Sequence, residues 1–173
     1  MINMLLAAAL LLTSPSSEEE AVLATVDATF EAFYAGDSAR MEPLLAESVQ
    51  LWPLTLDASR DTPVRKSLPL SREAWLAQIE GEEGRFAEVY WDPVVQIRAE
   101  RFAHVWTPYV IYADGERVHC GIDAFTLMKP EDKWLITDLA FTMEPQACEE
   151  LGWPEARARV RPASLRPHLP QAE

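Results

Sequence analysis

The sequence of 173 residues lacks most motifs on which common catalytic and cofactor sites are built. It has three histidines and two cysteines, and neither a Cys-x-x-Cys nor a His-x-His pair occurs. Because such pairs bring two ligands onto one metal ion, their absence argues against a zinc site. There is also no Gly-rich phosphate loop, no Gly-x-Ser-x-Gly motif and no dinucleotide-binding fingerprint. We therefore expect no metal and no cofactor.

An excess of positive charge is also missing. The formal net charge is −13 at pH 7. Residues 154–173 contain four arginines and two glutamates, a net +2, so the rest of the chain carries −15. An acidic body repels phosphate backbones, which argues against nucleic acid as a partner. We expect the basic, proline-punctuated tail to be a solvated extension lying on this acidic body; membrane or protein binding by the tail is the alternative.

The apolar run at residues 5–12 is too short to span a bilayer and matches the hydrophobic region of a signal peptide. The start of a buried helix is the alternative, because no Lys or Arg precedes the run. We predict a signal peptide over residues 1–16, a folded domain over 17–148 and a Pro- and Arg-rich tail over 149–173. The mature protein is then expected in the periplasm or outside the cell, with no membrane span after cleavage.

The first half of the folded domain is typical of helices. A capping box at residues 17–20 is followed by apolar residues at helical spacing, namely Val22, Val26, Phe30 and Phe33. Gly36 ends this helix, and a short second helix follows. Ser71 caps a third helix that extends to about residue 80. Between them we expect a short strand at 49–51 and a long loop over 54–70.

The second half is typical of strands. Apolar and aromatic patterns predict strands over 94–98, 102–112, 118–128 and 134–142. Asp114-Gly115 is a strong signal for a two-residue hairpin turn. Helices followed by strands indicate an α+β fold, with the helices on one face of an antiparallel sheet.

Three segments together resemble a known superfamily. They are the helix end at 33–37, the hairpin over 105–125 with its His-Cys-Gly-Ile-Asp-Ala-Phe run, and Trp-Leu-Ile at 134–136. The pattern over residues 20–145 resembles the nuclear transport factor 2-like superfamily, and within it an exported bacterial branch of the SnoaL-like and ketosteroid-isomerase-like proteins. The resemblance implies a cone-shaped, barrel-like domain whose bent sheet wraps helices around a small-molecule pocket, often as a homodimer through the sheet. It implies no particular activity, since one fold hosts many.

The steroid isomerases of this superfamily can be compared residue by residue. Their buried acid on a late strand matches Asp123. Their catalytic tyrosine falls at Thr29, and their general-base aspartate falls at Pro53. Because two of the three working groups are missing, steroid-isomerase chemistry is not supported.

Strand pairing predicts the neighbours of Asp123. Two-residue turns pair Asp123 with Trp106 and Phe125 with Asp138. Strand alternation then gathers polar and aromatic side chains on one face, namely His104, Trp106, Val110, His119, Asp123, Phe125 and Asp138. On this face Asp123 and Asp138 are diagonal neighbours, about 7–8 Å apart by Cα.

This face predicts acid–base chemistry. Two neighbouring carboxylates raise one another's pKa and burial raises it further, so Asp123 would donate a proton at neutral pH, assisted by Asp138. His104 or His119 would act as the base. Aromatic side chains would contact the ligand, namely Trp106, Phe125, Tyr109 and Phe30.

The opposite face is the alternative core. It is more uniformly aliphatic, with Val105, Ile111, Val118, Cys120, Ile122, Ala124 and Met128. The pattern alone could bury these residues and leave the aspartates and histidines in water. Only the resemblance to the superfamily implies that Asp123 faces a pocket; the pattern of residues does not decide between the two faces.

The two cysteines are Cys120 in a strand and Cys148 beyond the last strand. A segment that folds back after the last strand could bring them together, and an oxidising compartment would favour a disulfide. The alternative is a buried Cys120 and a free, exposed Cys148.

Three functional hypotheses follow. The first is an exported domain that binds a small hydrophobic molecule. The second is an isomerase- or dehydratase-type enzyme that uses Asp123. The third is a non-catalytic structural or interaction module whose cone is filled by its own side chains.

Overall fold

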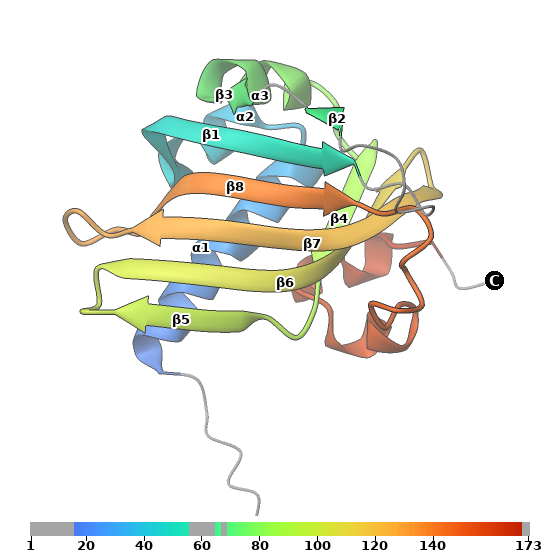
Figure 1. The fold of residues 1–173 in the computed structure, drawn as a ribbon. Helices are drawn as coiled ribbons and strands as arrows, with labels where there is room; N and C mark the ends of the chain where they lie inside the picture. The colour runs from blue at the N-terminus through green and yellow to red at the C-terminus, as the bar shows by residue number, and fades with distance from the viewer. Residues whose placement is uncertain (1–15, 56–64, 67–68, 171–173) are drawn as a thin grey trace, which may run out of the picture.

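The computed structural model describes residues 16–55, 65–66 and 69–170, which form a bent sheet around helices (Figure 1). The predicted signal peptide up to residue 15 and most of the predicted 54–70 loop lie outside the described residues. In chain order the elements are α1 (Ser17–Tyr34), α2 (Ser38–Met41), η1 (Glu42–Leu44), β1 (Leu45–Thr55), β2 (Arg65–Lys66), β3 (Leu70–Ser71), α3 (Arg72–Ile79), β4 (Phe86–Tyr90), β5 (Val94–Arg98), β6 (Phe102–Ala113), β7 (Glu116–Met128), β8 (Leu135–Met143), η2 (Glu155–Arg159) and η3 (Ala163–His168). No helix within these ranges is long and apolar enough to cross a membrane.

The three predicted helices are confirmed. The cap of α1 is Ser16, one residue before the predicted cap at Ser17, because the hydroxyl of Ser16 accepts the hydrogen bond from the Glu19 amide. α1 ends before Gly36, which has a positive φ of 60° and lies so close to Glu83 that a Cβ there would collide with its backbone. Ser71 caps α3 as predicted.

The sheet has eight strands, of which six follow the order β2-β1-β8-β7-β6-β4, while β3 pairs with β1 and β5 with β6. The expected antiparallel arrangement is wrong in one place, because β1 runs parallel to β8. β1 is also longer than the predicted strand at 49–51 and continues through Pro53. Pro53 pairs with Phe141 of β8 and lies between the β1 residues that pair with β3 and those that pair with β2.

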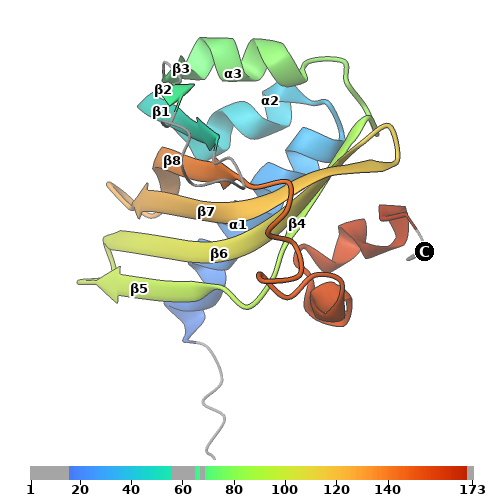
Figure 2. The ribbon, with the colours of Figure 1, turned by 45° about the vertical axis from the view of Figure 1, so that its right-hand side comes forward.

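The helices cover one face of this sheet, which we call the inner face. In Figures 1 and 2 α1 crosses behind β6, β7 and β8, and α2 and α3 lie near β1. β4 runs steeply behind the right-hand ends of β7 and β6 in Figure 1. The core lies between α1 and the inner face, with Val22, Val26, Phe30, Val105, Phe125 and Leu127 among its buried side chains. The α+β cone implied by the resemblance is therefore present.

Two β-bulges correct the predicted strand register. Next to the Asp114-Gly115 turn the pairing is as predicted, but Val118 is an extra residue on β7, so that Asp123 pairs with Thr107 and not with Trp106. Thr137 is an extra residue on β8, so that Phe125 pairs with Leu139 and not with Asp138. A one-residue shift moves every later side chain of a strand to the other face.

The C-terminal segment, residues 144–170, packs against the body, so the expectation of a solvated extension is wrong. Trp153 is 1% exposed and its ring packs at a tilt against Trp91, with centroids 5.4 Å apart. Val160, Leu165 and Leu169 are also buried. The expectation that the basic tail lies on the acidic body agrees with the structure.

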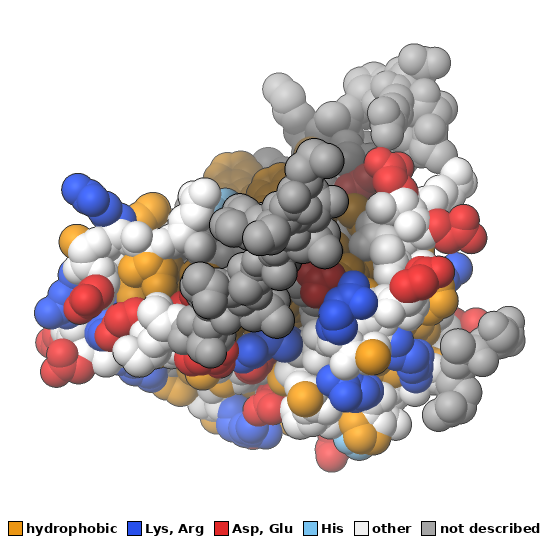
Figure 3. All heavy atoms as spheres, turned by 90° about the horizontal axis from the view of Figure 1, so that it is seen from below, with side chains coloured by type: hydrophobic (Ala, Val, Ile, Leu, Met, Phe, Trp, Pro, Cys, Tyr) orange, Lys and Arg blue, Asp and Glu red, His pale blue; other side chains and the backbone are white. Residues whose placement is uncertain are grey.

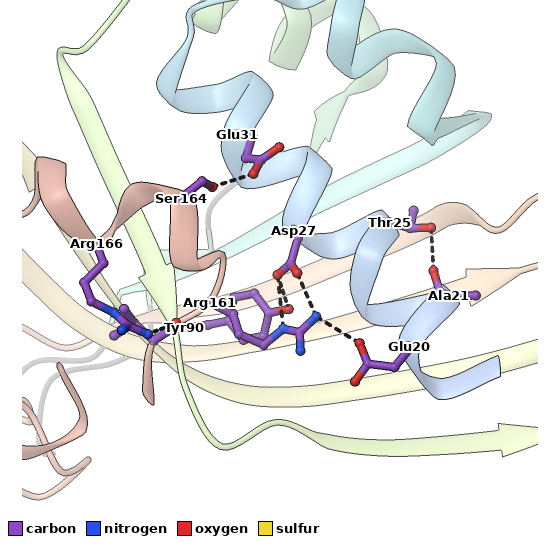
Figure 4. A network of polar contacts seen from close by, with 10 residues as sticks. Glu20, Ala21, Thr25, Asp27, Glu31, Tyr90, Arg161, Ser164 and Arg166 are labelled. Atoms are coloured by element: carbon purple, nitrogen blue, oxygen red, sulfur yellow. Dashed lines mark hydrogen bonds and ion pairs between the residues drawn. The ribbon is translucent and has the colours of Figure 1, made fainter. Parts of the chain in front are cut away.

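Arg161 of the C-terminal segment forms hydrogen bonds with α1 (Figure 4). Its guanidinium donates to both carboxylate oxygens of Asp27, and Asp27 also accepts a hydrogen bond of 2.7 Å from the Tyr90 hydroxyl. The backbones of Arg161 and Tyr90 exchange two further hydrogen bonds. Charge-assisted hydrogen bonds of this kind contribute about 1.5–3 kcal/mol each.

Basic and acidic side chains are intermingled on the face seen from below (Figure 3). Arg159 pairs with Asp92 at 2.7 Å, and Lys129 pairs with Glu18 at 2.9 Å. The Arg159–Asp92 pair joins the basic tail to the body, and neither Arg159 nor Lys129 lines the cavity described below.

Cys120 and Cys148 form a disulfide, as one of the two sequence alternatives predicted. Their Cα atoms lie 5.1 Å apart, because Cys120 sits beside Glu144 at the end of β8 and the chain then turns back. The bridge ties the start of the C-terminal segment to the outer face of β7.

Replacing both cysteines by alanine is expected to lower the free energy of unfolding by about 3–4 kcal/mol, because the bridge closes a loop of 28 residues. Urea denaturation followed by tryptophan fluorescence measures this difference. The wild-type protein in reducing agent is the control and should lose a similar amount. A free energy of unfolding of the double variant within about 1 kcal/mol of that of the oxidised wild-type protein would contradict the expectation.

Candidate functional site

A cavity of about 230 Å³ lies between the helices and the inner face of the sheet. Most of its surface is apolar and much of it aromatic, from Phe30, Phe33, Trp75, Tyr109, Phe125 and Phe141. Its polar groups include the side chains of Glu88, His119 and Asp123. None of the described residues that line the cavity is Lys or Arg.

Asp123 is the most buried charged group of the cavity. Strand alternation on β7 points it inward between His119 and Phe125, and only 2% of it is exposed. Its Oδ2 atom is fully buried and has no hydrogen-bond partner in the described structure. Burial, and secondarily the neighbouring Glu88, raises the pKa of Asp123 well above its usual range.

Glu88 is the carboxyl that accompanies Asp123. It lies on β4 opposite Ile111 of β6, which is itself opposite His119 of β7. Desolvation raises the pKa of Glu88 to about 8. Glu88 was not among the predicted site residues because no strand was predicted over β4, although the run Phe-Ala-Glu-Val-Tyr at 86–90 has the aromatic and β-branched residues typical of a strand.

Tyr109 and His119 form a hydrogen-bonded pair beside the two carboxyls. The Tyr109 hydroxyl lies 2.7 Å from the Thr142 carbonyl oxygen and 3.0 Å from Nε2 of His119. A carbonyl can only accept, so the hydroxyl donates to Thr142 and Nε2–H of His119 donates to the hydroxyl. Burial lowers the pKa of His119, so its ring is neutral and Nδ1 is its acceptor. Burial also raises the pKa of Tyr109, which keeps its hydroxyl protonated.

Gly121 makes this arrangement sterically feasible. It pairs with Tyr109 across the β6–β7 ladder. A Cβ atom at Gly121 would lie 2.8 Å from Cε1 of Tyr109 and would overlap the Thr142 carbonyl. The missing side chain therefore allows the Tyr109 ring to cross β7 and reach β8.

Five of the eight predicted site residues line the cavity: Asp123, His119, Phe125, Tyr109 and Phe30. The placement of the other three, His104, Trp106 and Asp138, is corrected by the bulges. They lie on the outer face, where Trp106 is exposed and Asp138 accepts a hydrogen bond from Trp52 Nε1. Asp138 is therefore not the acid that accompanies Asp123.

Thr29 occupies the position at which the steroid isomerases have their catalytic tyrosine. Thr29 lines the cavity, but its hydroxyl donates to the Thr25 carbonyl oxygen of the preceding turn at 3.0 Å. In the described ranges no group of three His, Cys, Asp or Glu side chains is arranged to hold a metal ion.

The two raised carboxyl pKa values give stability a definite dependence on pH. In the folded state these groups hold protons at a pH where the unfolded chain has released them, so the free energy of unfolding falls as pH rises. For Glu88 this window runs from 4.5 to about 8, with a slope of up to about 1.4 kcal/mol per pH unit. His119, with its lowered pKa, has the opposite slope below pH 6.5.

We expect the double variant Glu88→Gln, Asp123→Asn to lose this fall in stability. Denaturation curves at several values between pH 4.5 and 8 give the difference between the wild-type protein and the variant, in which the contribution of His119 cancels. Asp138→Asn, which makes a matched change on the outer face, should keep the wild-type slope. Parallel wild-type and double-variant profiles would show that neither carboxyl is perturbed.

Comparisons with known proteins identify the fold and not the activity. No protein-family model matches the sequence. No curated protein matches it either. Among solved structures, a nuclear transport factor 2-like protein from Cytophaga hutchinsonii is 13% identical with a TM-score of 0.58, covering 74% of this chain and 99% of its own.

Two other solved structures are similar. A Novosphingobium aromaticivorans protein provisionally described as a scytalone dehydratase is 13% identical with a TM-score of 0.55, covering 73% of this chain and 83% of its own. A protein of unknown function from Nostoc punctiforme with a cystatin-like fold is 9% identical with a TM-score of 0.58, covering 78% of this chain and 97% of its own. The chain therefore has the cystatin-like fold of the nuclear transport factor 2-like proteins.

Proposed function

We propose that this protein binds a small, mostly apolar molecule in the cavity of its inner face, with Asp123 and Glu88 recognising the polar group of that molecule. The observation that carries this proposal is the fully buried, unpartnered Oδ2 of Asp123 in a mostly apolar wall. An open cavity of about 230 Å³ supports binding over a cone filled by its own side chains.

The energetics of the site favour an occupied state. A buried polar group without a partner costs about 1–3 kcal/mol, and a ligand that hydrogen-bonds Asp123 recovers this amount. The aromatic wall contributes about 25 cal/mol for each Å² of apolar ligand surface that it covers. The apolar body of a ligand therefore supplies affinity, and the carboxyls fix its orientation.

Compounds with one phenyl body and different polar groups test the binding function. We expect at least one of ethylbenzene, 2-phenylethanol and 2-phenylethylamine to raise the thermal midpoint of the protein in a dose-dependent way. Asp123→Leu should abolish the preference for a polar group and favour ethylbenzene, while Asp138→Leu on the outer face should change nothing. Binding that is the same in both variants, or no binding by any compound, would contradict the proposal.

Acid–base catalysis is the second candidate function. It is favoured by a buried acid, Asp123, in the same cavity as a neutral imidazole, His119. Asp123 would protonate an oxygen of the substrate while Nδ1 of His119 accepts a proton from carbon, as an isomerase or dehydratase requires. One of the similar structures is provisionally described as a dehydratase.

Proton exchange separates catalysis from binding. If the site is catalytic, the α-hydrogens of a phenyl ketone such as propiophenone exchange in D₂O faster with the protein than without it, as followed by proton NMR. Asp123→Asn keeps a hydrogen-bond donor but cannot transfer the proton, so it should reduce the exchange rate at least about 100-fold. Unchanged exchange in the variant would leave binding as the function.

We also propose that the protein works as an exported homodimer. The disulfide supports an oxidising compartment such as the periplasm. The outer face supports dimerisation, because the exposed side chains of Val94, Trp106 and Trp52 lie in one cross-strand row with the small Ala124 and Ala140 between the tryptophans. Sedimentation should give a dimer for the wild-type protein and a monomer for Trp106→Glu; identical masses would rule out this interface.

A further inference from the structure

We propose that the ligand of the cavity is a small organic cation, an amine with an aromatic or aliphatic body. This inference rests on the proposed binding function and specifies the chemical class of the ligand. The juxtaposition that carries it is a pair of carboxyls, Asp123 and Glu88, set in a wall of aromatic rings to which no described Lys or Arg contributes.

The hydrogen-bonding inventory of the cavity favours a ligand that donates. The hydroxyls of Thr29 and Tyr109 both donate to backbone carbonyl oxygens, so their protons are already used. Nε2–H of His119 donates to Tyr109. Once a ligand displaces a proton from the carboxyls, the oxygens of Asp123 and Glu88 and the Nδ1 atom of His119 are acceptors, and the Gln78 amide adds one more oxygen beside its own N–H groups. An ammonium group, with up to three N–H donors, matches these acceptors.

The charges favour a cation over an anion or a neutral molecule. The ion-paired cationic side chains of the described structure face acidic partners elsewhere, such as Lys129 with Glu18 and Arg161 with Asp27. An anionic ligand would meet two carboxyls without a compensating charge. When a cationic ligand expels one proton from the carboxyl pair, the pair is left with a single negative charge, which one ammonium group neutralises.

The aromatic wall adds a second source of affinity for a cation. Phe30 and Phe125 lie in a T-shaped pair with centroids 6.0 Å apart, and Trp75, Phe33 and Phe141 complete the lining. Ring faces attract an ammonium group, and the attraction increases when water is excluded. The net charge of −13 also raises the local concentration of cations around the protein.

The affinity of the cavity for a cation should rise with pH. An ammonium ligand binds best to ionised carboxyls, so its binding expels a proton from the pair and its affinity rises between pH 5.5 and 8. A neutral ligand that accepts a hydrogen bond from a protonated carboxyl has the opposite dependence, and its affinity falls over the same range. An alkylamine stays charged throughout, since its pKa is about 10, like that of lysine.

Isothermal titration calorimetry with 2-phenylethylamine and its neutral isostere 2-phenylethanol tests the inference. The amine is expected to bind at least about tenfold more tightly than the alcohol at pH 8, to gain about tenfold between pH 5.5 and 8, and to release protons when two buffers of different ionisation enthalpy are compared. Asp123→Asn and Glu88→Gln should each reduce the affinity for the amine about tenfold more than the affinity for the alcohol. Asp138→Asn should behave like the wild-type protein.

The outcomes separate this inference from the binding function. If the alcohol binds as tightly as the amine, or if the affinity for the amine does not rise with pH, the cation inference is overturned while binding in the cavity stands. If neither compound nor ethylbenzene binds, the binding function fails and the cation inference fails with it.

Discussion

Two extra residues, Val118 on β7 and Thr137 on β8, decide which side chains share the cavity. Each inserts one residue into an antiparallel ladder, and the pairing beyond it shifts by one position. Without the first bulge, Asp123 would pair with Trp106, and Trp106 and His104 would lie on the same face of the sheet as Asp123. With both bulges, Asp123 and Phe125 lie inward beside Thr107 and Leu139, and Asp138 lies on the outer face. The cavity, its acid pair and the aromatic outer row all follow from this register.

Keeping a carboxyl buried without a partner has a free-energy cost, and the surrounding structure supplies the rigidity that maintains it. Tyr109 crosses above Gly121 to the Thr142 carbonyl and so links β6 to β8 over β7. The disulfide and the Arg161–Asp27 pair hold the C-terminal segment against β4, β7 and α1. The C-terminal segment therefore supports the strands that carry Glu88 and Asp123, although none of its described residues lines the cavity.

The sequence predicts most helices and strands, but it predicts less well the strand register and the packing of segments that are far apart in the chain. Helical spacing before residue 80 and the Asp114-Gly115 turn are local signals, and both correspond to observed elements. A bulge has no such signal here, because Val118 is an ordinary β-branched strand residue. Glu88 was not predicted because it is the single charged residue in β4 and interrupts the apolar pattern of this short strand. The C-terminal segment looks like a solvated tail by composition, and its docking depends on a partner 134 residues away, Asp27.

The protonation state of Asp123 at neutral pH tests the account most directly. Infrared difference spectroscopy on the wild-type protein and Asp123→Asn isolates the C=O stretch of this one carboxyl. We expect a protonated carboxylic acid band at neutral pH that is present in the ligand-free wild-type protein and absent from the variant. A carboxylate band instead, with Asp123 titrating near the ordinary pKa of an aspartate, would contradict the buried, unpartnered acid on which the proposed function depends.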